Sequence, residues 1–339
     1  MIQDLVKISK KMEKLRDRVP VELSYDIANI IAYHRFKYPI YTFTIGSKKS
    51  TAPVLFITGG VHGLEKIGAQ LAWSLLKTTL DKLQWDRSLQ QVFESIRMVF
   101  IPLLNPVGYI HQMRSNGNGV DLMRNSPIAA ETKVPFLLGG QRLSNKLPWY
   151  QGIDQQMEIE NLVLQDVFLA ETKNSACVIS VDLHSGFGLR DRIWFPFSYK
   201  QEPFDDIAPL YSLFSLFEQT YPYHVYHIEP QSFSYMMNGD MWDYLYIKWK
   251  EHQKKAVFIP LTLEMGSWNW VRKNPWQLFT RGGIFNPIKE HRLKRTYRRH
   301  HLFFDFLLRA LHSHPVWSSH PTESQEGLLK LAKSKWYKQ

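Results

Sequence analysis

Cysteine is almost absent from this sequence of 339 residues, which contains only Cys177. A single cysteine excludes an intramolecular disulfide framework and any zinc module built on several cysteines. The sequence also lacks an uninterrupted apolar run of about 20 residues, so no membrane-spanning helix is expected. Residues 1–20 mix apolar and charged side chains and lack the apolar stretch of about 7–15 residues found in secretory signals. These absences predict a cytoplasmic protein without a membrane partner.

Acidic residues are fewer than basic ones, with 31 Asp and Glu against 42 Lys and Arg, which gives a formal net charge of +11. Such an excess is compatible with nucleic acid, a membrane surface or an acidic substrate as a partner. Residues 289–339 hold 11 Lys and Arg against 4 Asp and Glu, so they supply +7 and the remaining 288 residues only +4. Apolar residues recur at helical spacing within 289–312, which indicates that its arginines form the solvated face of a packed helix. We therefore expect no nucleic-acid partner.

Short apolar runs alternate with segments of helical spacing along most of the chain. The runs are typical of strands buried on both faces and lie at 54–58, 98–101, 177–181 and 256–263. Helical spacing is found at 65–80, 155–170, 205–219 and 289–312. This alternation predicts an α/β protein with three layers, α/β/α, around a mixed, mostly parallel twisted sheet. We predict a single domain over residues 1–312, followed by a basic C-terminal tail over 313–339.

Residues able to bind a metal or accept a proton follow three of these apolar runs. His62 and Glu65 come after the first run, His184 after the third and Glu264 after the fourth. In an open α/β sheet ligands bind beyond the carboxyl ends of the strands, so we expect these side chains to lie together. Two histidines and one carboxylate with an open fourth position form a catalytic zinc set. We predict one Zn²⁺ held by His62, Glu65 and His184, and Glu264 as the base that takes a proton from the reacting water.

These residues and several further motifs resemble the carboxypeptidase A-like zinc metallopeptidases, the metallocarboxypeptidase family. The H-x-x-E zinc motif of the family is matched by His62 and Glu65, and its distant histidine by His184. Residues 105–109 and 114–125 are similar to the family motifs N-P-D-G and R-x-N…G-V-D-x-N-R-N. The resemblance implies a zinc-peptidase (phosphorylase/hydrolase-like) architecture. It also implies a zinc-dependent hydrolase that cleaves a peptide or amide bond next to a free carboxylate.

The same resemblance implies roles for residues in the 114–125 stretch. Arg114 would polarise the scissile carbonyl and stabilise the oxyanion, and Arg124 would receive the terminal carboxylate of the substrate. Where the family has an asparagine that helps to hold this carboxylate, the chain has Met123. Asn125 is the remaining amide candidate for substrate binding, although the side chains of neighbouring residues point in different directions.

Met123 leaves a second enzyme class open, an N-acyl amino-acid deacylase of the aspartoacylase and succinylglutamate desuccinylase type. The substrate is then either a peptide or an N-acyl amino acid with a free carboxylate. A different class is a basic polyanion-binding protein with a vestigial zinc site, but the intact Glu264 and Arg114 argue against it. No oligomeric state is predicted.

The resemblance also implies a mobile tyrosine between the third zinc ligand and the base. Residues 238–246 resemble the family's G…D-W-x-Y region. The spacing from Asp243 favours Tyr246 as the catalytic tyrosine, with Tyr244 as the second candidate.

Overall fold

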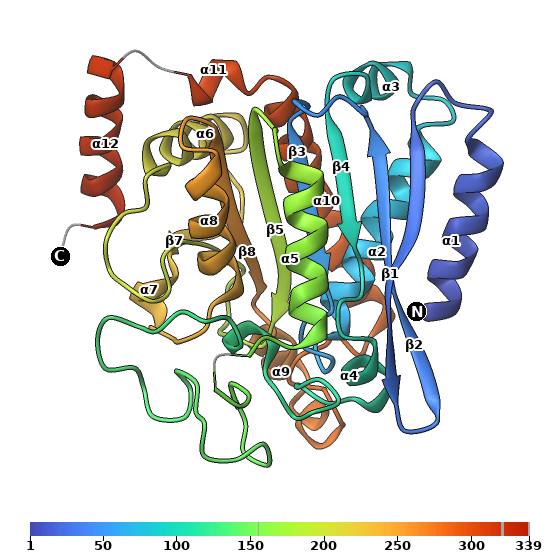
Figure 1. Ribbon diagram of the computed structural model, residues 1–339, viewed down its shortest axis with the longest axis vertical. Coiled ribbons are helices and arrows are strands. Elements are labelled where there is room, and N and C mark those ends of the chain that lie inside the picture. The colour runs from blue at the N-terminus through green and yellow to red at the C-terminus, as the bar shows by residue number, and fades with distance from the viewer. Residues whose placement is uncertain (155, 320–321, 338–339) are drawn as a thin grey trace.

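A twisted sheet of eight strands lies at the centre of the computed structural model, which describes residues 1–154, 156–319 and 322–337 (Figure 1). The strands are β1 (Leu23–Tyr33), β2 (Phe36–Gly46), β3 (Val54–Gly59), β4 (Arg97–Ile101), β5 (Cys177–Ser185), β6 (Arg192–Phe195), β7 (His227–Pro230) and β8 (Val257–Met265). Their order across the sheet is β1-β2-β4-β3-β5-β8-β6-β7. The central strands β4, β3, β5 and β8 are parallel, whereas β1, β2 and β6 each have an antiparallel neighbour. The predicted mixed, mostly parallel sheet is confirmed.

Helices cover both faces of this sheet, which confirms the predicted three-layer arrangement. The helices are α1 (Ile2–Leu15), α2 (Lys66–Lys82), α3 (Arg87–Phe93), α4 (Pro106–His111), α5 (Ile159–Thr172), α6 (Ile207–Thr220), α7 (Gln231–Ser234), α8 (Met241–His252), α9 (Trp268–Lys273), α10 (Glu290–His312), α11 (Pro315–Ser318) and α12 (Thr322–Trp336), with short 3-10 helices at Leu122–Arg124 and Pro275–Phe279. In Figure 1, α5 and α8 lie in front of the sheet, and α2 and α10 lie behind it. The hydrophobic core fills the space on both sides of the sheet.

Every residue of β3, β4, β5 and β8 is buried, as expected of strands that are covered on both faces. The four predicted apolar runs begin within one residue of these strands. However, β5 and β8 continue to Ser185 and Met265, so His184 and Glu264 lie inside the strands and not after them. Both polar side chains have partners inside the fold, since His184 contacts Asp182 and Glu65, and Glu264 accepts a hydrogen bond from the backbone N–H of Phe187.

Several elements differ from the sequence prediction, and β1 and α5 are two examples. The edge strand β1 was not predicted, because much of it is exposed and its burial does not alternate regularly. The helix predicted over 155–170 begins at Ile159 and extends to Thr172. Residue 155 lies outside the described part of the chain.

After residue 312 the described part of the chain continues as α11 and α12. Trp317 on α11 is buried and donates a hydrogen bond from Nε1 to the carbonyl oxygen of Ala310 at 2.7 Å. Trp336 at the end of α12 donates from Nε1 to the carbonyl oxygen of Ile228 at 3.0 Å. Two tryptophans therefore anchor this segment, and the division at residue 312 stays a prediction. None of the described helices is both long and apolar enough to cross a membrane.

His300 lies on the buried side of α10, with 1% of its surface exposed. Its Nδ1 is 2.9 Å from the hydroxyl oxygen of Tyr226, and its Nε2 is 3.9 Å from Oδ2 of Asp191. Burial lowers the pKa of His300 to about 4, although the nearby Asp191 carboxylate acts in the opposite direction. The histidine is therefore neutral in the folded protein at neutral pH.

This buried histidine predicts a loss of stability in mild acid. Because the pKa of His300 is about 4 in the folded protein against an ordinary 6.5, the unfolded chain binds more protons between these values. The free energy of unfolding is therefore unaffected by this histidine above pH 6.5 and decreases as the pH falls toward 4. Between pH 7 and pH 5, we expect the wild type to lose about 2 kcal/mol more unfolding free energy than His300→Gln.

Urea unfolding of the zinc-free protein at the two pH values would measure this difference. His252→Gln is the matched control, because His252 is exposed on the last turn of α8. The control should lose as much stability as the wild type. If His300→Gln lost as much unfolding free energy as the wild type between pH 7 and pH 5, the low pKa assigned to His300 would be wrong.

Candidate active site

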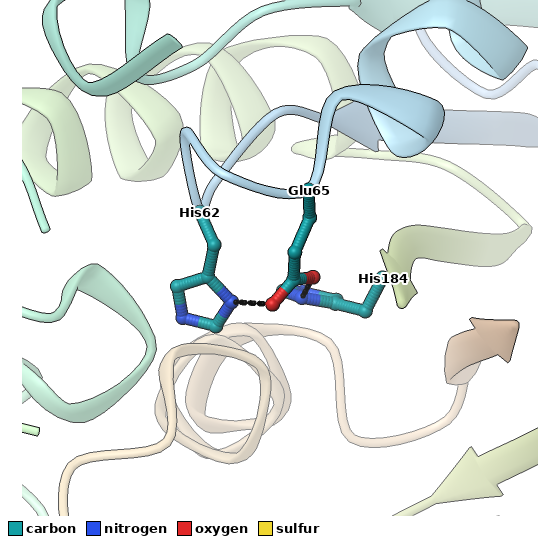
Figure 2. A group of neighbouring side chains, drawn as sticks. All are labelled: His62, Glu65 and His184. Atoms are coloured by element: carbon teal, nitrogen blue, oxygen red, sulfur yellow. Dashed lines mark hydrogen bonds and ion pairs between the residues drawn. The ribbon is translucent and has the colours of Figure 1, made fainter. Parts of the chain in front are cut away.

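His62 and Glu65 lie on the loop that connects β3 to α2, and both side chains are buried (Figure 2). The path of this loop depends on Gly63. A Cβ atom at Gly63 would lie 1.9 Å from the backbone carbonyl carbon of Gly108, so only glycine allows the two segments to pack this closely. The close approach fixes the loop against the segment that begins α4.

His184 and Glu264 lie side by side because they are partners in the parallel register of β5 and β8. Residues paired in this way have side chains on the same face of the sheet. His184 is 4% exposed and Glu264 is 6% exposed. The sheet thus brings one histidine and one carboxylate from distant parts of the sequence to the same place.

The structure brings His62, Glu65 and His184 together as a possible metal site (Figure 2). Their ligand atoms all lie within 4.8 Å of one another, with Nδ1 of His62 2.9 Å from Oε1 and Nδ1 of His184 3.1 Å from Oε2 of Glu65. The other ring nitrogens face carboxylates, since Nε2 of His62 is 2.9 Å from Asp121 and Nε2 of His184 is 2.8 Å from Asp182. Such outer carboxylates orient metal-binding histidines and leave the remaining nitrogen for the metal. The donor set fits Zn²⁺.

The electrostatics of this group favour positive charge at its centre. Burial alone would raise the pKa of Glu65, but His62 and His184 hold it well below its ordinary value. Burial would lower the pKa of His184, but Asp182 and Glu65 raise it well above its usual range. The negative charges of Glu65 and Asp182 therefore stabilise positive charge in this group, as the binding of a divalent cation requires.

Glu264 lies beside the three ligands but is not part of their group. Burial, with the charge of Glu65 as the second cause, raises the pKa of Glu264 to about 8. Its Oε1 accepts a hydrogen bond from the backbone N–H of Phe187 at 2.9 Å, which fixes the carboxyl group. A carboxyl group that can gain or lose a proton near neutral pH is suited to general acid–base chemistry.

The turn that follows Glu264 is held by Asp191, which precedes β6 and pairs with Arg299 on α10. Oδ1 of Asp191 accepts a hydrogen bond from the backbone N–H of Gly266 at 2.9 Å, and Oδ2 accepts one from Nη1 of Arg299 at 2.6 Å. The expectation that the arginines of α10 are only solvated is therefore wrong for Arg299. Through Asp191, Arg299 stabilises the end of β8, which carries Glu264.

Asp121 connects the two predicted arginines to the metal-binding group. Its Oδ2 accepts hydrogen bonds from Nε of Arg114 at 2.9 Å and from Nη1 of Arg124 at 3.1 Å. Burial would raise the pKa of Asp121, but the two arginines and His62 hold it well below its ordinary value. Arg114 also donates from Nη1 to Oε1 of Glu65 at 3.1 Å. The sequence motif contains Asp121, but its bridging role was not predicted.

These groups line a cavity of about 580 Å³. His62, Glu65, His184, Glu264, Arg114 and Arg124 all contribute to its wall. The rest of the wall is largely apolar and includes Met123, Leu138, Phe187, Trp194, Met237 and Trp268. The cavity thus combines a small polar cluster with a large apolar surface, as ligand-binding sites commonly do.

The structure places a different tyrosine in this cavity from the one chosen on sequence. Tyr246 is 2% exposed and donates its hydroxyl hydrogen bond to Oδ2 of Asp206 at 3.2 Å, away from the cavity wall. Tyr235, just after α7, lines the cavity. The choice of Tyr246 from the Asp243-x-x-Tyr spacing is corrected accordingly. No motif around Tyr235 indicated its position, which depends on packing between distant segments.

Asn125 is also not brought to the cavity. Its Nδ2 donates to the carbonyl oxygens of Gln151 and Gln156, both at 2.9 Å, and its Oδ1 accepts from the backbone N–H of Glu158 at 2.6 Å. These bonds hold the segment that leads into α5. The amide is already used in the protein's own structure, so the structure does not support Asn125 as a substrate-binding residue.

Comparison with known sequences identifies one family. The sequence pattern of the zinc carboxypeptidase family matches residues 35–269. Carboxypeptidase SOL1 of Arabidopsis thaliana is 30% identical over 93 residues, which make up 26% of this chain. The chain covers 19% of the length of this curated relative.

Comparison with solved structures agrees with the family match. Bovine thrombin-activatable fibrinolysis inhibitor, solved in complex with tick carboxypeptidase inhibitor, has a TM-score of 0.65 and 18% identity over 92% of this chain and 96% of that one. Carboxypeptidase A from Helicoverpa armigera has a TM-score of 0.64 and 17% identity over 92% of this chain and 72% of that one. At these identities the similarity shows a shared fold.

Proposed function

The chain belongs to the zinc carboxypeptidase family, and from this premise we propose that it hydrolyses a peptide or amide bond next to a free carboxylate. The observation that carries the proposal is the position of Glu264, which lies beside His62, Glu65 and His184 but outside their ligand group. A separate base next to a metal-binding group is the arrangement needed for metal-assisted hydrolysis.

His62, Glu65 and His184 would hold one Zn²⁺, which when bound would polarise the substrate carbonyl and lower the pKa of water from 15.7 to about 7. The carboxylate of Glu264 takes up a proton from the attacking water and passes it to the leaving amine. The guanidinium of Arg114 lies beside Glu65 and donates hydrogen bonds to the oxygen on which negative charge develops. Asp121 keeps this guanidinium in place.

Arg124 would bind the carboxylate of the substrate. Among the described hydrogen bonds, Nε of Arg124 donates to the carbonyl oxygen of Leu138 and Nη1 donates to Asp121. A substrate carboxylate would therefore be bound through Nη2.

Because Met123 lines the cavity instead of an amide side chain, this chain offers the carboxylate fewer hydrogen bonds. That feature supports the N-acyl amino-acid deacylase as the second candidate, whereas a cavity of about 580 Å³ has room for a longer peptide.

The cavity wall also supports a preference among peptides. The carboxylates in the wall, Glu65 and Glu264, belong to the reacting centre, and the rest is mainly apolar. A lysine or arginine side chain would lose its hydration there without gaining a partner. We propose a preference for peptides with an apolar or aromatic C-terminal residue.

A substrate panel tests both proposals. We expect kcat/KM for a peptide ending in Phe or Leu to exceed that for the same peptide ending in Lys by about 100-fold, because an unpaired charge is costly to bury. The C-terminally amidated peptides serve as controls and should be poor substrates. Faster hydrolysis of small N-acyl amino acids than of any peptide would assign the deacylase activity instead.

A further inference from the structure

Exposed apolar and basic side chains gather on two segments that also contribute residues to the cavity wall. Among the described residues, the large apolar side chains exposed by at least 70% are Trp85 (70%), Phe136 (82%), Leu143 (71%), Ile153 (71%), Tyr223 (96%), Trp276 (78%) and Phe279 (83%). Trp85 and Tyr223 lie in the turns after α2 and α6. The others lie on two segments, 131–154 and 266–289. We call these two segments together the mouth surface.

The two segments flank the same opening. Residues 131–154 contribute Leu138 and Trp149 to the cavity wall, and residues 266–289 contribute Trp268, Ile284 and Phe285. Figure 1 shows both segments beyond the ends of β5 and β8, with the first in green and the second in orange around α9. Five of the seven most exposed large apolar side chains thus lie on the two segments that contribute to the cavity wall.

Basic residues accompany these exposed apolar side chains. Residues 266–289 contain no acidic residue, and their basic residues, all exposed, are Arg272, Lys273, Arg281 and Lys289. Residues 131–154 contain three exposed basic residues and two acidic ones. The mouth surface is therefore both apolar and positively charged, unlike the mixed surface typical of a soluble domain.

We propose that the mouth surface binds the surface of an anionic lipid bilayer. Aromatic side chains insert into the boundary between headgroups and acyl chains, and Lys and Arg beside them are attracted by acidic headgroups. Trp276 and Phe279 have ring centroids 6.0 Å apart and project from the same short helix, next to Arg272 and Lys273. A protein would lie on the membrane in this way without spanning it. This proposal revises the expectation of no membrane partner and does not depend on the catalytic proposal.

Charge distinguishes a bilayer from other partners. A second copy of the chain would present the same positive charge, and its 266–289 segment offers no acidic residue to pair with it. A neutral bilayer would interact with the aromatic side chains but would not attract the basic ones. An anionic bilayer matches both features at once.

Sedimentation of the zinc-loaded protein of 339 residues with lipid vesicles tests the proposal. We expect binding to vesicles that contain phosphatidylglycerol, weak binding to pure phosphatidylcholine, and a decrease with added salt. Trp276→Ser/Phe279→Ser and Arg272→Gln/Lys273→Gln should each lower the partition coefficient by about 10-fold or more. Trp85→Ser is the matched control, because it removes an exposed tryptophan elsewhere on the molecule and should leave binding unchanged. Far-ultraviolet circular dichroism would establish that the variants fold.

Three outcomes would overturn the proposal. The first is the absence of binding to anionic vesicles at low salt. The second is that both mouth-surface variants bind as well as the Trp85 variant. The third is a dimer in solution that Trp276→Ser/Phe279→Ser dissociates, without vesicle binding by the wild type. In that case the surface is an interface between copies.

Discussion

Glu264→Gln is expected to abolish measurable hydrolysis while zinc stays bound. The substituted amide has nearly the same shape as the carboxyl group and can still accept the hydrogen bond from the backbone N–H of Phe187. It cannot take up a proton, so the step assigned to Glu264 fails. Loss of a general base costs about 10²–10⁴ in rate, and here the same group also returns the proton to the leaving amine. The measurements are kcat/KM on the best peptide and zinc content by elemental analysis.

The matched control for this variant is Glu160→Gln. Glu160 is also a buried glutamate whose pKa is raised by burial, but it lies at the start of α5 with Asn116 as its partner. We expect Glu160→Gln to keep wild-type activity. This result would show that the loss of activity in Glu264→Gln is not a general effect of removing a buried carboxyl group. Near-normal hydrolysis by Glu264→Gln would refute its role. Loss of zinc from that variant would show that Glu264 is a ligand.

Much of the candidate site could be predicted from the sequence, because its residues are tied to local patterns. The apolar runs before His62, His184 and Glu264 are long enough to identify buried strands, and parallel strands bring their carboxyl ends to one edge of a sheet. The register that pairs His184 directly with Glu264 could not be predicted, since it depends on how β5 and β8 are aligned. The position of the site therefore followed from the sequence, but its exact contacts did not.

Residues placed by contacts between distant segments were missed or misassigned. Tyr246 fits a motif spacing, yet Asp206, 40 residues earlier in the chain, holds its hydroxyl in the core. Tyr235 reaches the cavity without any local signal. Arg299 looked like one solvated charge among several, but Asp191 on a distant segment pairs with it. In each case a partner far along the chain determines where the side chain lies, and no local pattern encodes that partner.

Loss of a proposed zinc ligand should have a larger effect than any change around it. His184→Ala is expected to remove both zinc and activity, because it deletes one of three ligand atoms. It also leaves the buried carboxylates of Asp182 and Glu65 without their shared histidine partner. Glu65 keeps His62 and Arg114, but Asp182 loses its histidine partner. Removing one partner of a buried ion pair costs about 3–5 kcal/mol, so the variant should also be less stable than the metal-free wild type. Elemental analysis, hydrolysis assays and thermal unfolding would measure these three effects.

Asp182→Asn provides the graded comparison for this experiment. Of the two ring nitrogens of His184, Asp182 contacts the outer one, Nε2, and not the ligand atom Nδ1. Asp182 also accepts a hydrogen bond from Nε1 of Trp242 at 2.9 Å. Loss of its charge therefore leaves all three ligand atoms in place. Weakening such an outer carboxylate typically lowers metal affinity by about 10–100-fold. Activity of Asp182→Asn should therefore return when excess zinc is added, as should activity of the wild type after chelation, whereas His184→Ala should stay inactive. Stoichiometric zinc in His184→Ala, or no recovery of the chelated wild type with zinc, would contradict the assigned metal site.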